Sequence, residues 1–200
     1  KIVEDSRTGV MWIPLREGGL VRVANGRATL LGGNTSLPNL LVSPIQDRQG
    51  RIWIGGVDAI YRVDDPAANI VKGQTVISGL RARVLALEED AFGTIYAATQ
   101  AGLFSIDPQT VRLRQYSTFD GLPSGDIETL ASGPDGALWI GSDRGLARLA
   151  GGSLTEVKEL AERAVESLAV TRNGEVWAGV DGDGIFYNDG KAWTQLTLAD

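Results

Sequence analysis

Short runs of apolar residues recur along this chain and are separated by Gly, Pro, Asp and Asn. One pattern, a Gly followed by any residue, an aliphatic residue and an aromatic residue, occurs five times. Its aromatic residues are Trp12, Trp53, Tyr96, Trp139 and Trp177, which lie 41, 43, 43 and 38 positions apart. A period near 40 residues indicates a repeat architecture.

Two further sets of apolar residues keep the same period. A small residue and then an aliphatic one follow each aromatic, with the aliphatic residue seven or eight positions after it; the pairs are Gly19-Leu20, Ala59-Ile60, Gly102-Leu103, Gly145-Leu146 and Gly184-Ile185. Aliphatic residues also precede the aromatics by nine and twelve positions, as Leu130 and Ile127 do in the fourth repeat. The second repeat departs from this pattern, with Pro44 nine positions before Trp53.

Each repeat is predicted to form four short strands. In the fourth repeat, one strand passes through Ile127 and Leu130, a turn covers 134–136, and two more strands cover 137–141 and 146–149. An outer fourth strand is clearest at 113–118 in the preceding repeat, where Gly121 and Pro123 then redirect the chain. Strands of five residues span only about 17 Å, so one sheet must stack on its neighbours. The pattern therefore predicts an all-β fold, a β-propeller of four-stranded antiparallel blades.

The boundaries of the five repeats follow from this register. They fall at about 1–38, 39–80, 81–123, 124–163 and 164–200, within a single propeller array. Lys1 aligns with Glu128, and the last residues stop where a Gly-Leu-Pro junction would follow. We expect either a ring that closes with five blades or part of a longer propeller, and the second alternative is the stronger one.

Two features of the sequence allow an interpretation other than the structural repeat. The aromatics could form a sugar-binding cage, but five copies at one register favour a structural role in which each ring packs between blades. Residues 155–168 are rich in Glu, Ala, Leu and Lys and alone would favour a helix. The spacing of Val165 and Leu168 fits the other repeats, so we expect strand, loop and strand there.

The amino-acid composition disfavours several classes of site and of binding partner. The chain has no Cys and no His, which removes thiolate nucleophiles, the commonest general base and the commonest transition-metal ligand. A net charge of −6 disfavours nucleic-acid binding. No apolar run is long enough for a membrane span, and no signal peptide is visible. We expect no cofactor, no metal and no membrane contact by this segment.

Residues 120–124, 135–141 and 145–149 together resemble the two-component regulator propeller repeat. The resemblance extends over all five repeats and is weaker in the third, where Tyr96 replaces Trp, and in the fifth, where Asn188 replaces an aliphatic residue. It implies the extracytoplasmic, periplasmic sensor region of bacterial hybrid histidine kinases, usually built as seven-bladed propellers. A downstream kinase and dimerisation through the full-length protein are implied in the same way.

Charged residues in the loops at one end of the blades are the candidate ligand-binding set. They are Arg16, Arg81, Arg83, Asp126, Asp143, Arg144 and Asp181. Arg donors and carboxylate acceptors suit the hydroxyls of an oligosaccharide or a similar polar solute, although charged hairpin tips also serve solubility. Residues 181–184, Asp-Gly-Asp-Gly, are too short for a calcium loop, and we interpret them as a turn.

Three functions remain open after these observations. A non-catalytic sensor that binds a small polar ligand is the favoured one. A propeller-scaffold lyase is weakened by the absence of His and would have to use a Tyr, an Arg or a carboxylate pair, such as Tyr61 or Asp181 with an Arg. A protein-interaction scaffold is disfavoured only by the family resemblance.

Overall fold

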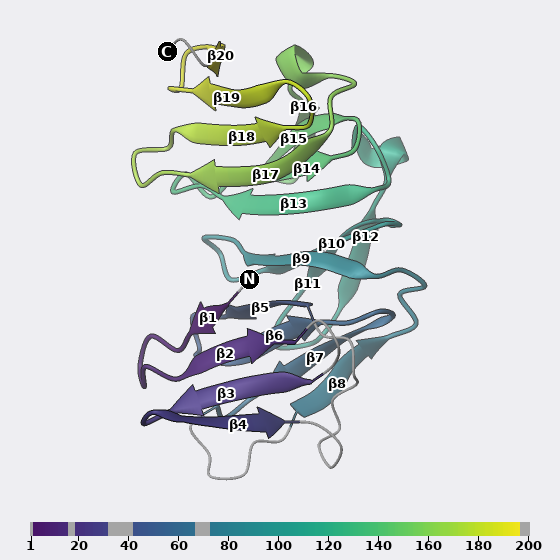
Figure 1. Cartoon of the computed structure of the whole chain (residues 1–200). Coiled ribbons are helices and arrows are strands. Elements are labelled where there is room, and N and C mark those ends of the chain that lie inside the picture. The colour runs from purple at the N-terminus through teal and green to yellow at the C-terminus, as the bar shows by residue number, and fades with distance from the viewer. Residues whose placement is uncertain (1, 16–18, 32–41, 67–72, 197–200) are drawn as a thin grey trace. The chain divides into compact units, whose positions relative to one another are not determined.

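The computed structural model describes residues 2–15, 19–31, 42–66 and 73–196. It is all-β, with five antiparallel four-stranded sheets in which each strand pairs with the next along the chain (Figure 1). The chain divides into two compact units. The first contains residues 1–87 and 109–111, and the second contains 88–108 and 112–200.

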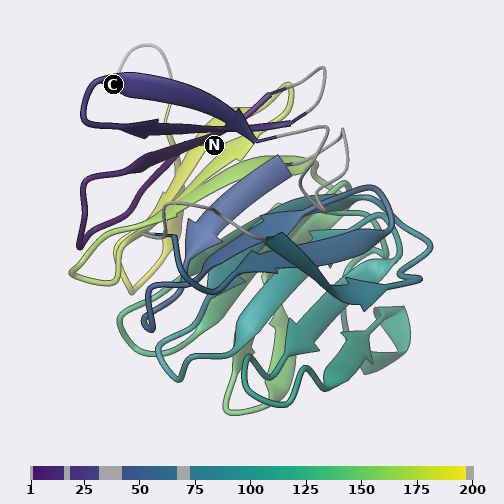
Figure 2. The same ribbon diagram turned by 90° about the horizontal axis from the view of Figure 1, so that it is seen from below.

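Four strands make up each sheet. The first sheet contains β1 (Val3–Glu4), β2 (Met11–Pro14), β3 (Leu20–Ala24) and β4 (Arg27–Leu31), and the second contains β5 (Val42–Gln46), β6 (Ile52–Gly55), β7 (Ala59–Val63) and β8 (Gly73–Ser78). The third sheet contains β9 (Val84–Glu89), β10 (Ile95–Thr99), β11 (Gly102–Ile106) and β12 (Leu113–Tyr116). The up-and-down course of the strands can also be followed in Figure 2.

The last two sheets belong to the second unit. They contain β13 (Ile127–Ser132), β14 (Leu138–Ser142), β15 (Gly145–Ala150) and β16 (Ser153–Glu156), and then β17 (Val165–Val170), β18 (Val176–Val180), β19 (Gly184–Asn188) and β20 (Trp193–Leu196). Two short 3₁₀ turns, η1 (Thr118–Asp120) and η2 (Lys158–Leu160), lie in the links between sheets. The prediction of a propeller built from four-stranded antiparallel blades is confirmed.

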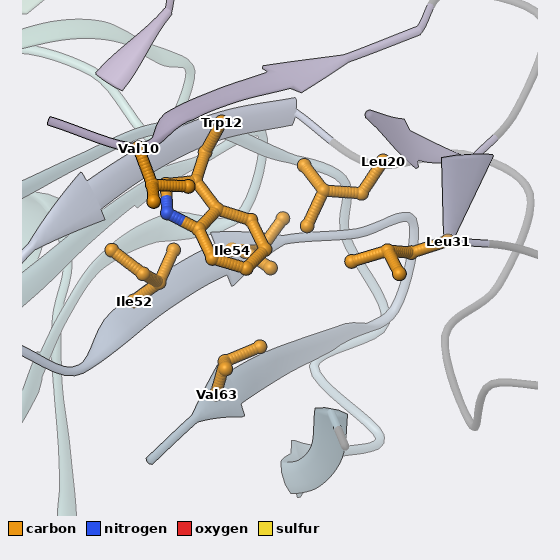
Figure 3. Packing of buried hydrophobic residues seen from close by; sticks show 7 residues of the cluster. All are labelled: Val10, Trp12, Leu20, Leu31, Ile52, Ile54 and Val63. Carbon is orange, nitrogen blue, oxygen red and sulfur yellow. The ribbon is translucent and has the colours of Figure 1, made fainter. Parts of the chain in front are cut away.

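Successive side chains of the second strand point to opposite faces of the sheet, so each blade has an aromatic face and an aliphatic face. In the first unit, Trp12 of β2 packs in one apolar cluster with Ile52 and Ile54 of β6 (Figure 3). In the second unit, the ring of Trp139 on β14 meets the edge of Trp193 on β20, with 6.0 Å between ring centroids. The aromatic face of one blade therefore packs against the aliphatic face of the next, as the repeat predicts.

A small residue two positions after the aromatic lets the next blade approach closely. A Cβ added at Gly55 would lie 2.6 Å from Cγ1 of Val84, and one added at Gly141 would lie 2.9 Å from Cγ1 of Val165. Val84 and Val165 are the first residues of β9 and β17 and are completely buried. The Gly thus provides the space that the first strand of the next blade fills.

Buried aspartates organise the turns between the first and second strands, a feature the sequence did not predict. Asp47 accepts hydrogen bonds from the backbone N–H groups of Gln49 and Arg51, and its other oxygen accepts from Nε1 of Trp53 at 2.7 Å. Asp90 accepts from the backbone N–H groups of Phe92 and Thr94 in the same way. The carboxylate therefore fixes the turn and, in the second blade, also the orientation of the interblade Trp.

Residues 155–168 do not form an α-helix. The strand, loop and strand that the repeat spacing predicts are confirmed. They contain the end of β16, the three-residue turn η2 and the start of β17. Val165 and Leu160 are completely buried there, and Leu168 packs against the same cluster. Tertiary contacts of these apolar residues outweigh the helix propensity of the Glu- and Ala-rich segment.

Pro44 is accommodated by an irregularity in the first strand of the second blade. The pairing of β5 with β6 shifts register between Val42 and Ile45, which leaves Pro44 outside the regular ladder. Ser43 has a left-handed backbone with φ of 44°, and its hydroxyl donates to the carbonyl of Leu85 at 2.7 Å. A bulge therefore explains how Pro can occupy a strand position at which the other repeats carry aliphatic residues.

Gly141→Ala should destabilise the chain by about 1–3 kcal/mol, because the new methyl group has no space between Thr129 and Val165. Gly125→Ala is the matched control, since a Cβ at Gly125 would meet no atom of the described residues within 4 Å. Denaturant titration of both variants measures the difference. Equal midpoints for the two variants would contradict the close packing of the blades.

Asp47→Ala should destabilise by about 3 kcal/mol or more, because it leaves buried donors and Arg51 without their carboxylate. Asp64→Ala removes a half-exposed partner of Arg62 and should change stability by about 1 kcal/mol or less. Thermal or chemical unfolding compares the two. A small effect at Asp47 would show that the turn does not depend on its carboxylate.

Candidate functional site

The predicted ligand-binding residues lie on loops that backbone hydrogen bonds hold in place. In the second unit, the N–H of Asp143 donates to the carbonyl of Asp126 at 3.2 Å, and the N–H of Asp181 donates to the carbonyl of Ala164 at 2.9 Å. The N–H of Glu162 donates to the carbonyl of Arg144 at 2.9 Å. We call residues 117–126, 143–144, 157–164 and 181–183 the loop edge of the second unit.

Buried leucines anchor the links that run into the next blade. Leu122 and Leu160 are buried in the second unit, and Leu80 is buried in the first. The Leu of the Gly-Leu-Pro junction is therefore an apolar anchor, and the polar residues that follow it are held on a fixed base.

In the first unit, Arg81 and Arg83 are exposed on the link between β8 and β9. Arg81 has a left-handed backbone with φ of 55°, and its N–H donates to the carboxylate of Asp58 in the turn between β6 and β7. The structure thus holds the backbone of Arg81 and leaves the guanidinium group at the surface. Arg16 lies outside the described residues.

In the second unit, Asp126 and Asp143, two residues of the predicted set, lie side by side and are joined by a backbone hydrogen bond. Burial and the nearby charge of Asp143 raise the pKa of the Asp126 carboxyl. Oδ1 of Asp126 is buried and has no hydrogen-bond partner among the residues that the structure describes. Asp143 and Arg144 are exposed beside it in the turn between β14 and β15. This pair gives the loop edge hydrogen-bond acceptors in a partly dehydrated setting.

Two further carboxylates, Glu128 and Glu166, belong to the same site and were not predicted. Burial and the charges of Asp126, Asp143 and Glu166 raise the pKa of Glu128. The first strands change register between Ile127 and Thr129 and between Val165 and Ser167, so each Glu lies at a bulge. A bulge redirects a side chain out of the strict alternation of the strand, and this places both Glu residues near the loop edge.

Asp181 lines a hollow of about 400 Å³ on the last sheet. The other lining residues are Glu166, Ser167, Gly179, Val180, Gly182, Gly184 and Ile185. Asp183, in the same turn, forms an ion pair with Arg163, whose guanidinium carbon lies 5.3 Å from the centre of the Phe186 ring. The hollow therefore has an acidic rim and a floor of Gly and aliphatic residues.

Residues 181–183 form the turn that joins β18 to β19, in agreement with the interpretation from the sequence. This turn has three residues, like the turn between β6 and β7 and one more than the turn between β14 and β15. Across the described ranges, no group of three or more acidic residues could hold a metal ion. Over the same ranges, no helix is long and apolar enough to cross a membrane.

The fold is similar to that of several solved β-propeller proteins. The extracellular domain of BT3049 from B. thetaiotaomicron, assigned to a hybrid two-component system, gives a TM-score of 0.81 at 19% identity, covering 100% of this chain and 28% of that one. The corresponding domain of BT4673 from the same organism gives a TM-score of 0.67 at 15% identity, with 100% and 33% covered. This chain therefore spans about a third or less of these extracellular-domain structures.

A second kind of protein shares the fold. Virginiamycin B lyase from Staphylococcus aureus gives a TM-score of 0.73 at 17% identity, covering 100% of this chain and 69% of the lyase. No protein-family model matches the chain, and no curated protein matches it. The chain is thus a β-propeller whose structural neighbours include extracellular domains of two-component systems, as the resemblance of its repeats predicts.

Asp126→Asn should make the chain more stable at neutral pH, because it removes a carboxylate whose ionisation burial and Asp143 disfavour. The pKa of this group is raised in the folded state, so its ionisation destabilises the fold as the pH rises above its ordinary value of about 4. Parent and variant should therefore converge at about pH 3 and separate at about pH 7. Unfolding midpoints across that range measure this, and a variant that is less stable at neutral pH would contradict the assignment.

Proposed function

We propose that this chain is part of the extracytoplasmic sensor region of a bacterial two-component signalling protein. It binds a polar solute, such as an oligosaccharide, at its loop edges and does not transform it. The observation that carries the proposal is the likeness of the whole chain to extracellular domains assigned to two-component systems. The resemblance of residues 120–149 to the regulator propeller repeat supports the same proposal.

The chemistry of the loop edges suits an uncharged polar ligand rich in hydroxyl groups. Carboxylates of Asp126, Asp143 and Glu128 accept hydrogen bonds from hydroxyls, and the exposed guanidinium group of Arg144 donates them. In a partly dehydrated setting such hydrogen bonds are stronger than in bulk water. Because these groups lie on loops fixed by backbone hydrogen bonds, little ordering is needed when a ligand binds.

A lyase is the second candidate, because virginiamycin B lyase and a streptogramin B lyase share the fold. A histidine-to-alanine variant of the former is described as catalytically inactive, and this chain contains no His. Burial and the charge of Asp58 raise the pKa of Tyr61, so its phenol is a poor source of the phenolate that a base requires. These observations favour binding over catalysis.

A protein-interaction role is the third candidate. The similar structure of YCF48, with a TM-score of 0.68, contains a bound D1 peptide. A peptide ligand would need main-chain partners or apolar pockets, whereas the loop edge of the second unit offers charged side chains. The polar solute remains the better fit to this edge.

Binding to a glycan array, followed by calorimetry on each hit, tests the proposal. We expect binding of at least one oligosaccharide with no change in its mass after prolonged incubation. Replacing Asp143 and Arg144 by Ala should weaken binding by about tenfold or more, because each removes a charge-assisted hydrogen bond. A second double variant, with Arg81→Ala and Arg83→Ala, tests the link between β8 and β9 in the first unit. We call this link, residues 79–83, the loop edge of the first unit.

Arg172→Ala is the matched control, since Arg172 is exposed in the turn between β17 and β18, at the opposite ends of the strands. Its affinity should equal that of the parent chain. Cleavage of a bound glycan would overturn the sensor assignment. Unchanged affinity in both loop-edge pairs would show that the binding site lies elsewhere.

A further inference from the structure

Three buried polar atoms on one face of the first sheet have no hydrogen-bond partner among the residues that the structure describes. They are Oδ2 of Asp5, Nε1 of Trp12 and Nε of Arg22. Asp5 and Trp12 are completely buried, so bulk solvent does not reach their polar atoms. Buried polar groups in folded proteins are almost always paired, either with the protein or with an ordered water molecule.

The strand register brings the three side chains to the same face of the sheet. Trp12 of β2 pairs with Val3 of β1 on one side and with Arg22 of β3 on the other. Asp5 follows Val3 by two positions, and its N–H donates to the carbonyl of Val10 at 2.7 Å. Because alternate residues of a strand point to the same face, Asp5, Trp12 and Arg22 are neighbours there.

The second sheet has the same three positions, and there the carboxylate and the indole are joined directly. Trp53 pairs with Ile45 on one side and with Arg62 on the other, and Asp47 follows Ile45 by two positions. Oδ2 of Asp47 accepts from Nε1 of Trp53 at 2.7 Å and from Nε of Arg51 at 2.6 Å. The two buried groups of this blade therefore satisfy each other without a mediator.

Two differences separate the turn of the first blade from that of the second. The first turn is one residue longer, because the N–H of Asp5 donates to the carbonyl five positions ahead and that of Asp47 to the carbonyl four positions ahead. Val10 also occupies the place of Arg51, so the carboxylate of Asp5 lacks that guanidinium donor. Oδ2 of Asp5 and Nε1 of Trp12 are therefore buried without the direct bond that their equivalents form.

The ionised form of Asp5 makes a donor for Oδ2 necessary. Burial would raise the pKa of this carboxyl, but hydrogen bonds from Gln46, Arg7 and Thr8 and the charge of Arg7 lower it overall. One of these bonds runs from the N–H of Arg7 to Oδ1 at 2.9 Å. The group is therefore a carboxylate at neutral pH, and a buried carboxylate oxygen without a donor is costly.

We propose that a single buried water molecule binds between Asp5, Trp12 and Arg22. It donates a hydrogen bond to Oδ2 of Asp5 and accepts one from Nε1 of Trp12 and one from Nε of Arg22. The three atoms select this ligand, because one is an acceptor and the other two are donors only. A metal or ammonium ion cannot accept from the two N–H groups, and the carboxylate repels an anion. Water has both the proton and the two lone pairs that the site requires.

Nuclear magnetic resonance of the unmodified chain tests the proposal, with Trp53 as the matched control. In a rotating-frame experiment, dipolar transfer from a bound water and chemical exchange with water give peaks of opposite sign. We expect a dipolar peak at the indole N–H of Trp12 and none at that of Trp53, which donates to Asp47. No such peak at Trp12, or equal peaks at both indoles, would overturn the proposal.

A crystal structure at a resolution that shows ordered water provides a second measurement. We expect a water oxygen at about 2.7–3.2 Å from Oδ2 of Asp5, Nε1 of Trp12 and Nε of Arg22. A direct hydrogen bond between Asp5 and Trp12 would contradict the inference, because no mediator would then be needed. An ion at this place would contradict it as well, since the donor set would then have been misread.

Discussion

Stacking of the aromatic face of one blade on the aliphatic face of the next is the interaction on which this structure depends. A four-stranded sheet with strands of two to six residues cannot bury both faces alone. The side chains of the second strand alternate between the two faces of the sheet. In the second, fourth and fifth blades this places a large ring and a Gly on one face and two aliphatic residues on the other. Trp12 with Ile52 and Ile54, and Trp139 with the cluster that contains Ala178 and Val180, are two instances of the same solution.

The loops at the blade ends are positioned by this stacking. The first residue of β17 fills the space above Gly141, and the link that leads to it is anchored by Leu160. Carboxylates of the loop edge therefore rest on a packed base. Burial and, in addition, their mutual proximity raise the pKa of Asp126 and Glu128, so gathering these acceptors on one side of the unit disfavours their ionised form.

Most of the fold could be predicted from the sequence because each blade repeats the same Gly and aromatic spacing. That register was sufficient to place β16 and β17 correctly within residues 155–168, where local propensity alone favours a helix. The buried role of Asp47 and Asp90 could not be predicted, because Asp in a turn is common and its burial depends on the neighbouring strands. The available signal was an Asp three residues before the Gly, which only the second and third repeats have.

The candidate site was predicted less completely. Asp126 and Asp143 of the predicted set lie side by side, whereas the nearby Glu128 and Glu166 were missed because a bulge changes the direction of a side chain without a sequence signature. Trp177 and Trp139 occupy equivalent positions of their repeats, but Trp139 packs against Trp193 of the next blade and Trp177 against Tyr187 of its own sheet. A double-mutant cycle between Trp139 and Trp193, with each replaced by Ala, tests the stacking of blades most directly. The account predicts a coupling of about 0.5–1.5 kcal/mol in the free energy of unfolding, and strictly additive effects would contradict it.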